Sequence, residues 1–248
     1  MPITHLLLDI EGTTCPVSFV AEVLFPYASR QLPAYLQAHG ADPEIQALVA
    51  AVDQAWQADA DADAQALRQQ QAGASRAAAV VPYLQALIAR DIKLTPLKDL
   101  QGRIWRAGYA SGELVAPLYS DVPAALQRWQ QSGLVLAVYS SGSVPAQQLL
   151  YGHSQAGDLR PLFSHWFDTR SGAKQEAGSY RSIAASMGCD PAAALFVSDS
   201  LAELEAAAAA GMVVLFSDRE GNPGRDSGPF ERIADYSLLN PPDGPQRP

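Results

Sequence analysis

The sequence predicts an α/β protein in which a parallel sheet is covered by helices on both faces and an all-helical segment is inserted. Short apolar runs over residues 6–8, 134–139 and 194–197 have the composition of strands buried on both faces. In the second half of the chain these runs alternate with segments of helical periodicity, which favours parallel strands with right-handed crossovers. Residues 16–114, by contrast, predict helices and no strand.

The first strand introduces the charged groups around which the chain is organised. Its apolar run ends in two carboxylates, Asp9 and Glu11, followed by Gly12. Open α/β sheets bind their ligands at the carboxyl ends of strands. Acids placed there are costly to bury unless a cation or hydrogen-bond donors compensate them. The stretch therefore indicates either a functional site or an ordinary acidic turn.

The inserted segment divides into several predicted helices. Apolar residues recur at helical spacing between residues 16 and 39, and Pro26 and Pro33 interrupt them, so we expect two helices there. The acid-rich stretch ADADADAQ, residues 58–65, is expected to be a solvated helix start or a loop. The remaining helices are predicted over residues 44–56, 74–90 and 95–112.

In the second half, helices and strands alternate. Gly133, Gly188 and Gly211 each follow a helical pattern, as a residue that ends a helix does. Helices are predicted over residues 121–132, 145–151, 179–188 and 201–210, and strands over 134–139, 166–169, 194–197 and 212–216.

Polar side chains follow three of the buried strands. Ser140 and Ser141 follow the second run, and Asp199 follows the run at residues 194–197. Because the strands are predicted to be parallel, these residues and the acids after the first strand share one edge of the sheet. Lys174 lies in a nearby loop, SGAKQEAGSY. Each signal is weak alone, but together they predict a catalytic site.

Composition narrows the possible partners. The 248-residue chain has a formal net charge of −9, which argues against binding to nucleic acid or anionic membranes. Its two cysteines, Cys15 and Cys189, form no disulfide framework and no zinc motif. We see no leader and no membrane-spanning run, so a cytoplasmic protein is expected. A monomer is the default expectation.

The order of these residues resembles that of the haloacid-dehalogenase-type phosphohydrolases. That family has an acid pair after the first strand, a Ser or Thr after a second, a lysine, and an acid after a further strand. The resemblance implies a Rossmann-like core over residues 1–15 and 115–248. It also implies that residues 16–114 form the helical cap domain that the family inserts after its first motif.

Within that superfamily the chain resembles the enolase-phosphatases of methionine salvage. The segments that carry the likeness are DIEGTT, LQGRIWRAGYASGEL, YSSGS and FDTRSGAKQEAGSY. The family implies a phosphorylated diketone substrate, 2,3-diketo-5-methylthiopentyl-1-phosphate. This compound is enolised and then hydrolysed to the acireductone 1,2-dihydroxy-3-keto-5-methylthiopentene and phosphate. The family also implies one Mg²⁺ per subunit.

The resemblance assigns the catalytic roles as follows. Asp9 is the expected nucleophile, which forms an aspartyl-phosphate. Glu11 is the expected general acid and then base. It is also our candidate for the enolisation base, which the sequence does not identify. Lys174 supplies positive charge to the phosphate and the nucleophile.

The same resemblance implies the binding groups. Ser140 and Ser141 are expected to hold phosphate oxygens through hydroxyl and backbone N–H groups. Asp9 and Asp199 are expected to bind Mg²⁺ through carboxylates, and Glu11 through its main-chain carbonyl.

Several alternatives stay open. In the segment SDSLAE, Glu203 has either a role at the metal or a role in orienting Lys174. Three residues of the insertion contact either the substrate or other cap helices: Trp105, Arg106 and Tyr109. The competing functions are a generic Mg²⁺-dependent phosphatase, a haloacid dehalogenase and a non-catalytic binding protein on the same fold.

Overall fold

A computed structural model describes residues 1–71 and 73–240 of the chain. The chain forms two compact units: Met1–Val20 together with the chain from Val115 onward, and Ala21–Leu114. The first junction therefore lies after Val20, whereas the sequence analysis places it after residue 15. Assignment of the second unit as a cap remains a prediction.

The first unit contains a six-stranded sheet of order β3-β2-β1-β4-β5-β6 in which every pair is parallel. This confirms the predicted α/β class with a parallel Rossmann-like core. The two-residue strand β6 was not predicted. The strands are β1 His5–Leu8, β2 Val135–Tyr139, β3 His165–Phe167, β4 Ala194–Ser198, β5 Val213–Ser217 and β6 Arg232–Ile233.

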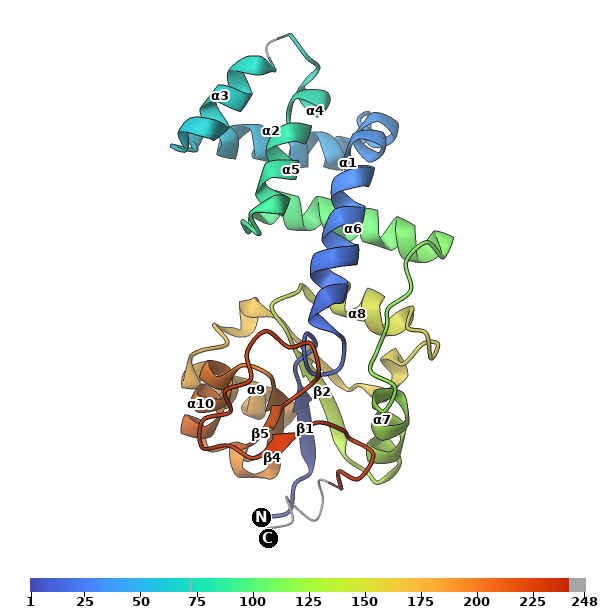
Figure 1. Ribbon diagram of the computed structural model, residues 1–248, viewed down its shortest axis with the longest axis vertical. Coiled ribbons are helices and arrows are strands. Elements are labelled where there is room, and N and C mark those ends of the chain that lie inside the picture. Colours follow the sequence, from blue (N-terminus) through green and yellow to red (C-terminus); the bar gives the residue numbers. More distant parts are fainter. Residues whose placement is uncertain (72, 241–248) are drawn as a thin grey trace. The chain divides into compact units, whose positions relative to one another are not determined.

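Helices cover both faces of this sheet, with α9 and α10 on one side and α7 and α8 on the other (Figure 1). On the first side, Leu7 and Phe196 of the central strands pack in one buried cluster with Ile183 and Leu204. Neighbouring side chains of a strand point to opposite faces, so a central strand covered on both faces is apolar throughout. The helices are α7 Val122–Gln131, α8 Val144–Gly152, α9 Ala177–Met187 and α10 Leu201–Ala209.

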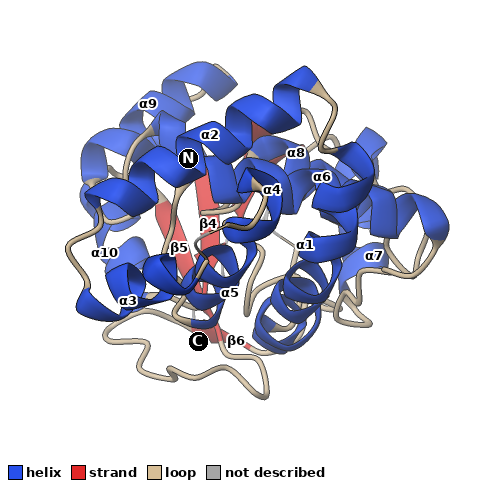
Figure 2. Ribbon diagram, turned by 90° about the horizontal axis from the view of Figure 1, so that it is seen from above, coloured by secondary structure: helices blue, strands red, loops and turns tan. Residues whose placement is uncertain are grey.

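All the elements that the structure describes within Ala21–Leu114 are helices. The strands drawn in Figure 2 belong to the first unit. In the second unit Trp56 stacks on Tyr83 with ring centroids 4.8 Å apart. No described helix is long and apolar enough to cross a membrane. The helices are the π-helix Phe19–Leu24, which begins before the junction, then α1 Phe25–His39, α2 Pro43–Ala58, α3 Ala62–Gln70, α4 Arg76–Ala79, α5 Val81–Ala89 and α6 Thr95–Ser111.

Two helices lie between residues 16 and 39, as predicted, and the second begins just before Pro26. The predicted interruption at Pro33 is wrong, because Pro33 lies inside the continuous helix α1. A proline within a helix leaves the carbonyl four residues earlier without its usual N–H partner. Here that carbonyl belongs to Ser29, and it accepts a hydrogen bond from the side-chain amide of Gln85 at 3.0 Å. A residue distant in the sequence therefore supplies the missing donor.

The single helix predicted over residues 74–90 is also wrong, because α4 and α5 are separate helices. Pro82 stands in the first turn of α5, where its missing N–H has no cost. Of the two alternatives for the acid-rich stretch, the structure shows the helix start: the Asp61 carboxylate accepts from the backbone N–H of Asp63 at 2.9 Å and caps α3.

Of the three insertion residues left open by the sequence, Trp105 makes contacts within the second unit. The indole N–H of Trp105 donates to the carbonyl of Leu24 at 2.9 Å, and its ring stacks with Phe25. Tyr109 is buried, whereas Arg106 is exposed. The contacts of Trp105 and the burial of Tyr109 favour the packing interpretation for both.

The two cysteines are expected to react differently. Cys15 is buried, and this burial raises the pKa of its thiol to about 12, whereas Cys189 is only partly buried. Since the thiolate is the nucleophile, iodoacetamide at pH 8 should modify Cys189 alone until the protein is unfolded. Peptide mass spectrometry before and after denaturation measures this. Two adducts on the folded protein would contradict it.

Candidate active site

The sheet register brings three strand ends to one level. Leu8 of β1 pairs with Val138 of β2 and with Val197 of β4. One residue further, Asp9 is level with the last residues of β2 and β4. Ser140 and Asp199 follow these directly, at the same edge of the sheet. Parallel pairing therefore gathers residues that lie up to 190 positions apart in the sequence.

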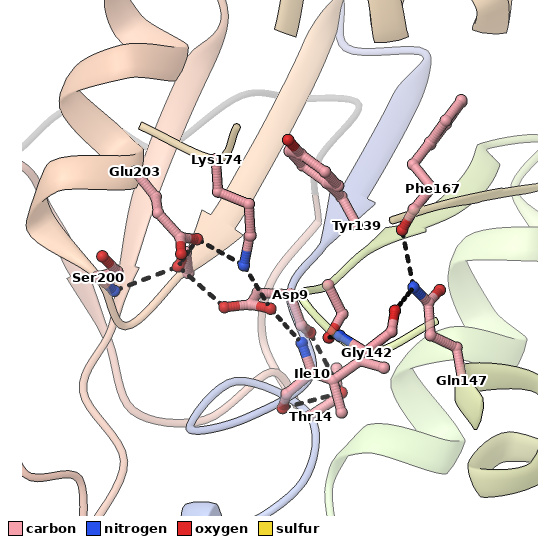
Figure 3. Close-up of polar contacts among 12 residues, drawn as sticks. Asp9, Ile10, Thr14, Tyr139, Gly142, Gln147, Phe167, Lys174, Ser200 and Glu203 are labelled. Atoms are coloured by element: carbon pink, nitrogen blue, oxygen red, sulfur yellow. Dashed lines mark hydrogen bonds and ion pairs between the residues drawn. The ribbon is translucent and has the colours of Figure 1, made fainter. Parts of the chain in front are cut away.

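Asp9 is buried, with 6% of its surface exposed, and both of its carboxylate oxygens have partners. Oδ1 lies 2.8 Å from the ammonium of Lys174 and accepts the backbone N–H of Ile10 at 2.8 Å. Oδ2 lies 3.2 Å from the hydroxyl of Ser198. Figure 3 shows this carboxylate pointing toward the lysine. These contacts fix its orientation.

Lys174 lies between two carboxylates, because its ammonium is also 2.7 Å from Oε2 of Glu203 (Figure 3). The hydroxyl of Ser198 lies 3.0 Å from the same Glu203 oxygen. The four side chains thus form a closed ring: Asp9, Lys174, Glu203 and Ser198. This geometry supports the orienting role that the sequence left open for Glu203. The sequence analysis did not single out Ser198, whose contact with Asp9 joins residues 189 positions apart.

The turn after β1 is shaped by its own backbone. The carbonyl of Ile10 accepts N–H groups from Thr13, Thr14 and Cys15 at 2.9 to 3.2 Å. Gly12 has φ +65°, and a Cβ there would lie 2.1 Å from Oδ2 of Asp199. Only glycine permits both this backbone and the close approach of Asp199.

Residues from the C-terminal part of the first unit hold this turn from outside. Ser217 and Asn222 each donate a side-chain hydrogen bond of 2.9 Å to the carbonyl of Gly12. The hydroxyl of Tyr236 donates to the next carbonyl, that of Thr13, at 3.1 Å. The sequence carried no local signal for these contacts.

Ser140 and Ser141 differ in their surroundings. Ser140 is buried, its hydroxyl accepts the N–H of Gly142 at 3.2 Å, and its own N–H donates to the carbonyl of Phe167 at 3.2 Å. Its backbone N–H is therefore already bonded within the protein, and phosphate binding by Ser140 stays a prediction. Its hydroxyl stays a candidate, and Ser141 is exposed beside it.

Gln147 of α8 fixes the loop that carries these serines. Its side-chain amide donates to the carbonyls of Gly142 and Phe167, both at 2.8 Å (Figure 3). Asp168, another buried residue that the sequence analysis did not select, accepts the backbone N–H of Val144 at 3.2 Å and so caps α8.

The site has more negative charge than its lysine compensates. Burial alone would lower the pKa of Lys174, but the charges of Asp9 and Glu203 outweigh burial and raise it. Burial, followed by the charge of Asp9, raises the pKa of Asp199 to about 7. The same two causes raise the pKa of Glu203. Carboxylates whose pKa values are raised in this way favour the binding of an additional cation.

The donor set fits Mg²⁺ in its chemistry. Asp9 and Asp199 supply hard carboxylate oxygens, and burial together with the charge of Asp9 raises the pKa of Asp199. Among the described residues, no three His, Cys, Asp or Glu side chains are arranged to hold a metal. An ion here would take its other ligands from water and main-chain oxygens, as Mg²⁺ commonly does.

Stability of the metal-free protein should fall as the pH rises from about 4 to about 7. The raised pKa of Asp199 means that the folded state keeps a proton which the unfolded chain releases in this range. Thermal unfolding in EDTA at pH 5 and pH 8 measures the effect, which we expect to be several degrees. Asp199→Asn should flatten this slope, and Mg²⁺ should stabilise the wild type more at pH 8. An equally steep slope in Asp199→Asn would contradict the assignment.

Comparison with known families adds to this geometry. Residues 3–211 match the haloacid dehalogenase-like hydrolases. The chain is 52% identical to a protein named Enolase-phosphatase E1 from Synechococcus elongatus, over 96% of this chain and 98% of that one. It is 48% identical to Enolase-phosphatase E1 from Prochlorococcus marinus, again over 96% and 98% of the two chains.

Solved structures agree in fold. The UTR4 protein of Saccharomyces cerevisiae is 33% identical with a TM-score of 0.74, over 96% of this chain and 100% of that one. CbbY of Rhodobacter sphaeroides, solved in complex with phosphate, has a TM-score of 0.60 over 96% of each chain. At 18% identity, this second likeness supports the fold alone.

Proposed function

The chain belongs to the haloacid dehalogenase-like hydrolases, and we propose that within this family it is the enolase-phosphatase of methionine salvage. Its substrate is then 2,3-diketo-5-methylthiopentyl-1-phosphate, and its products are the acireductone and phosphate. The observation that carries the proposal is a buried carboxylate, Asp9, held 2.8 Å from a buried ammonium in a chain similar along nearly its full length to enolase-phosphatases.

In the proposed mechanism Asp9 attacks the phosphorus atom. The bond from phosphorus to the enol oxygen breaks as the bond to the aspartate forms, which gives an aspartyl-phosphate. Glu11 donates a proton to the leaving oxygen and then accepts one from the water that hydrolyses the intermediate. Glu11 fits this role because it is only partly buried, on the turn that follows Asp9.

Lys174 lowers the electrostatic cost of bringing an anionic nucleophile to an anionic phosphate. Its place between Asp9 and Glu203 supports this role, because the lysine stays charged and fixed before substrate arrives. The hydroxyl of Ser140 and the polar groups of Ser141 hold phosphate oxygens.

Asp9 and Asp199 are the side chains that would hold the proposed Mg²⁺, together with the main-chain carbonyl of Glu11. The bound ion would supply positive charge to the phosphate and to a substrate carbonyl. Glu11 is assigned as the base that removes the substrate proton in enolisation. The second unit, Ala21–Leu114, is proposed to be the cap that excludes water.

The deciding experiment supplies the diketo phosphate with Mg²⁺ and follows enol absorbance and phosphate release together. We expect both signals, with the enol formed first, and we expect EDTA to abolish phosphate release. Phosphate release without an enol would indicate a generic phosphatase. Phosphate release that survives EDTA would contradict metal dependence.

A further inference from the structure

Three consecutive carbonyl oxygens of the loop that carries Lys174 each accept a hydrogen bond from a side-chain hydroxyl. We call residues 172–174 the lysine loop. The donors and acceptors are Tyr139 with Gly172 at 3.0 Å, Ser179 with Ala173 at 2.8 Å, and Tyr180 with Lys174 at 2.7 Å. Backbone hydrogen bonds from Gly172 to Thr169 and from Glu176 to Ala173 connect the loop to its neighbours in sequence, and the three side chains add contacts to β2 and α9.

The three donors are themselves held rigidly. Tyr139 is the last residue of β2, and Ser179 and Tyr180 lie in the first turn of α9. Both tyrosines are fully buried, and their rings meet edge to face with centroids 5.6 Å apart. Tyr180 also packs against Phe196 of β4, with centroids 5.1 Å apart. The three hydroxyls therefore hold the loop in a fixed position relative to β2 and α9.

The fit between loop and donors is tight. Gly172 has φ +125°, and a Cβ there would lie 2.1 Å from the hydroxyl oxygen of Ser179. At the other end of the loop, the ammonium of Lys174 lies 5.6 Å from the centroid of the Tyr139 ring, which adds a cation–π contact. Tyr139 thus contacts the side chain of Lys174, and Tyr180 bonds to its backbone carbonyl.

We propose that Tyr139, Ser179 and Tyr180 are positioning residues that hold Lys174 in line with Asp9 for phosphate binding. The inference rests on the proposed function of Lys174 as the phosphate-binding cation. The hydroxyls bond to loop carbonyls, so they act through the lysine. Because phosphoryl transfer depends on positioning, a small shift of the loop lowers activity although every catalytic group is still present.

Tyr180→Phe is the sharpest test, since it removes one hydroxyl and keeps the buried ring. Kinetics with the diketo phosphate and calorimetric titrations with Mg²⁺ and then with inorganic phosphate compare it with the wild type. We expect kcat/KM and phosphate affinity to fall about tenfold, the effect of losing one hydrogen bond. Mg²⁺ affinity should be unchanged. A general destabilisation of the fold would instead weaken the binding of both phosphate and Mg²⁺.

A double-mutant cycle with Lys174→Met separates positioning from a direct role. If Tyr180 acts through the lysine, Tyr180→Phe has no further effect on phosphate affinity once Lys174 is replaced. The same loss in both backgrounds would overturn the inference. The matched control is Tyr83→Phe, which removes a hydroxyl bonded to Asp59 at 2.9 Å in the second unit and should leave phosphate binding unchanged.

The outcomes separate this inference from the proposed function. If the wild type binds phosphate but does not turn over the diketo phosphate, the proposed function fails, whereas the binding cycle still decides the role of Tyr180. If turnover is normal and Tyr180→Phe matches the wild type in both assays, the inference alone fails. If Tyr180→Phe does not fold, Ser179→Ala enters the same cycle in its place.

Discussion

Replacing Asp9 by asparagine should abolish phosphate release while leaving the protein folded. The amide has the shape of the carboxylate and can keep the contact with the N–H of Ile10. Lys174 also keeps its second partner, Glu203. An amide cannot form the phosphoryl intermediate, so we expect the rate of phosphate release to fall about 10⁴-fold or more.

This variant also tests whether the two chemical steps are separate. If Asp9 serves only hydrolysis and ion binding, Asp9→Asn with Mg²⁺ at high concentration should still convert the diketone to the enol phosphate, which then accumulates. Rapid mixing with detection of enol absorbance and a coupled phosphate assay measures both steps. Loss of enolisation in a variant that still binds Mg²⁺ would contradict this scheme.

A matched control is available in the same unit. Asp158 is an exposed aspartate that also pairs with a basic side chain, Arg160, at 2.6 Å. Asp158→Asn removes the same charge from the protein and should leave both steps intact. The comparison separates the position of Asp9 from the general loss of one carboxylate.

Replacing Lys174 by methionine should reduce both activity and stability. Removal of a preorganised group that stabilises the transition state typically costs about 2.7–4 kcal/mol, or 10²- to 10³-fold in rate. Removal also leaves Asp9 and Glu203 buried without their shared cation. Breaking a buried ion pair by deleting one partner destabilises by about 3–5 kcal/mol.

The stability loss should depend on pH in a defined direction. Without the ammonium, which holds the pKa of Glu203 down, that pKa should rise further in the folded state. Folding then retains protons that the unfolded chain releases, and stability falls as the pH rises. Denaturant unfolding at pH 5 and pH 8 should therefore reveal a larger deficit at pH 8. A deficit independent of pH would indicate lost packing rather than lost charge.

The control is an exposed lysine. Lys93 pairs with Asp91 at 3.4 Å, and both side chains are more than half exposed. Exposed ion pairs contribute about 0–1 kcal/mol. Lys93→Met should therefore change stability little at either pH and leave the rate of phosphate release unaltered.

Local sequence was sufficient for the central strands of the sheet but not for β6 or for every helix boundary. Strands β1, β2 and β4 were predictable because a strand covered on both faces must be apolar along its length. The continuation of helix α1 through Pro33 was not predictable. The side chain of Gln85, 52 positions away, replaces the lost backbone donor. Such compensation leaves no trace in the neighbouring sequence.

For the candidate site, the sequence alone determined which residues end the buried strands: Asp9, Ser140 and Asp199. Parallel pairing then requires them to share an edge, whatever their separation along the chain. Only the tertiary structure decided that Glu203 pairs with Lys174 and that Tyr180 holds the lysine backbone. The physical reason is that hydrogen bonds and ion pairs depend on distances between elements, whereas hydrophobic periodicity reports only which side of an element is buried.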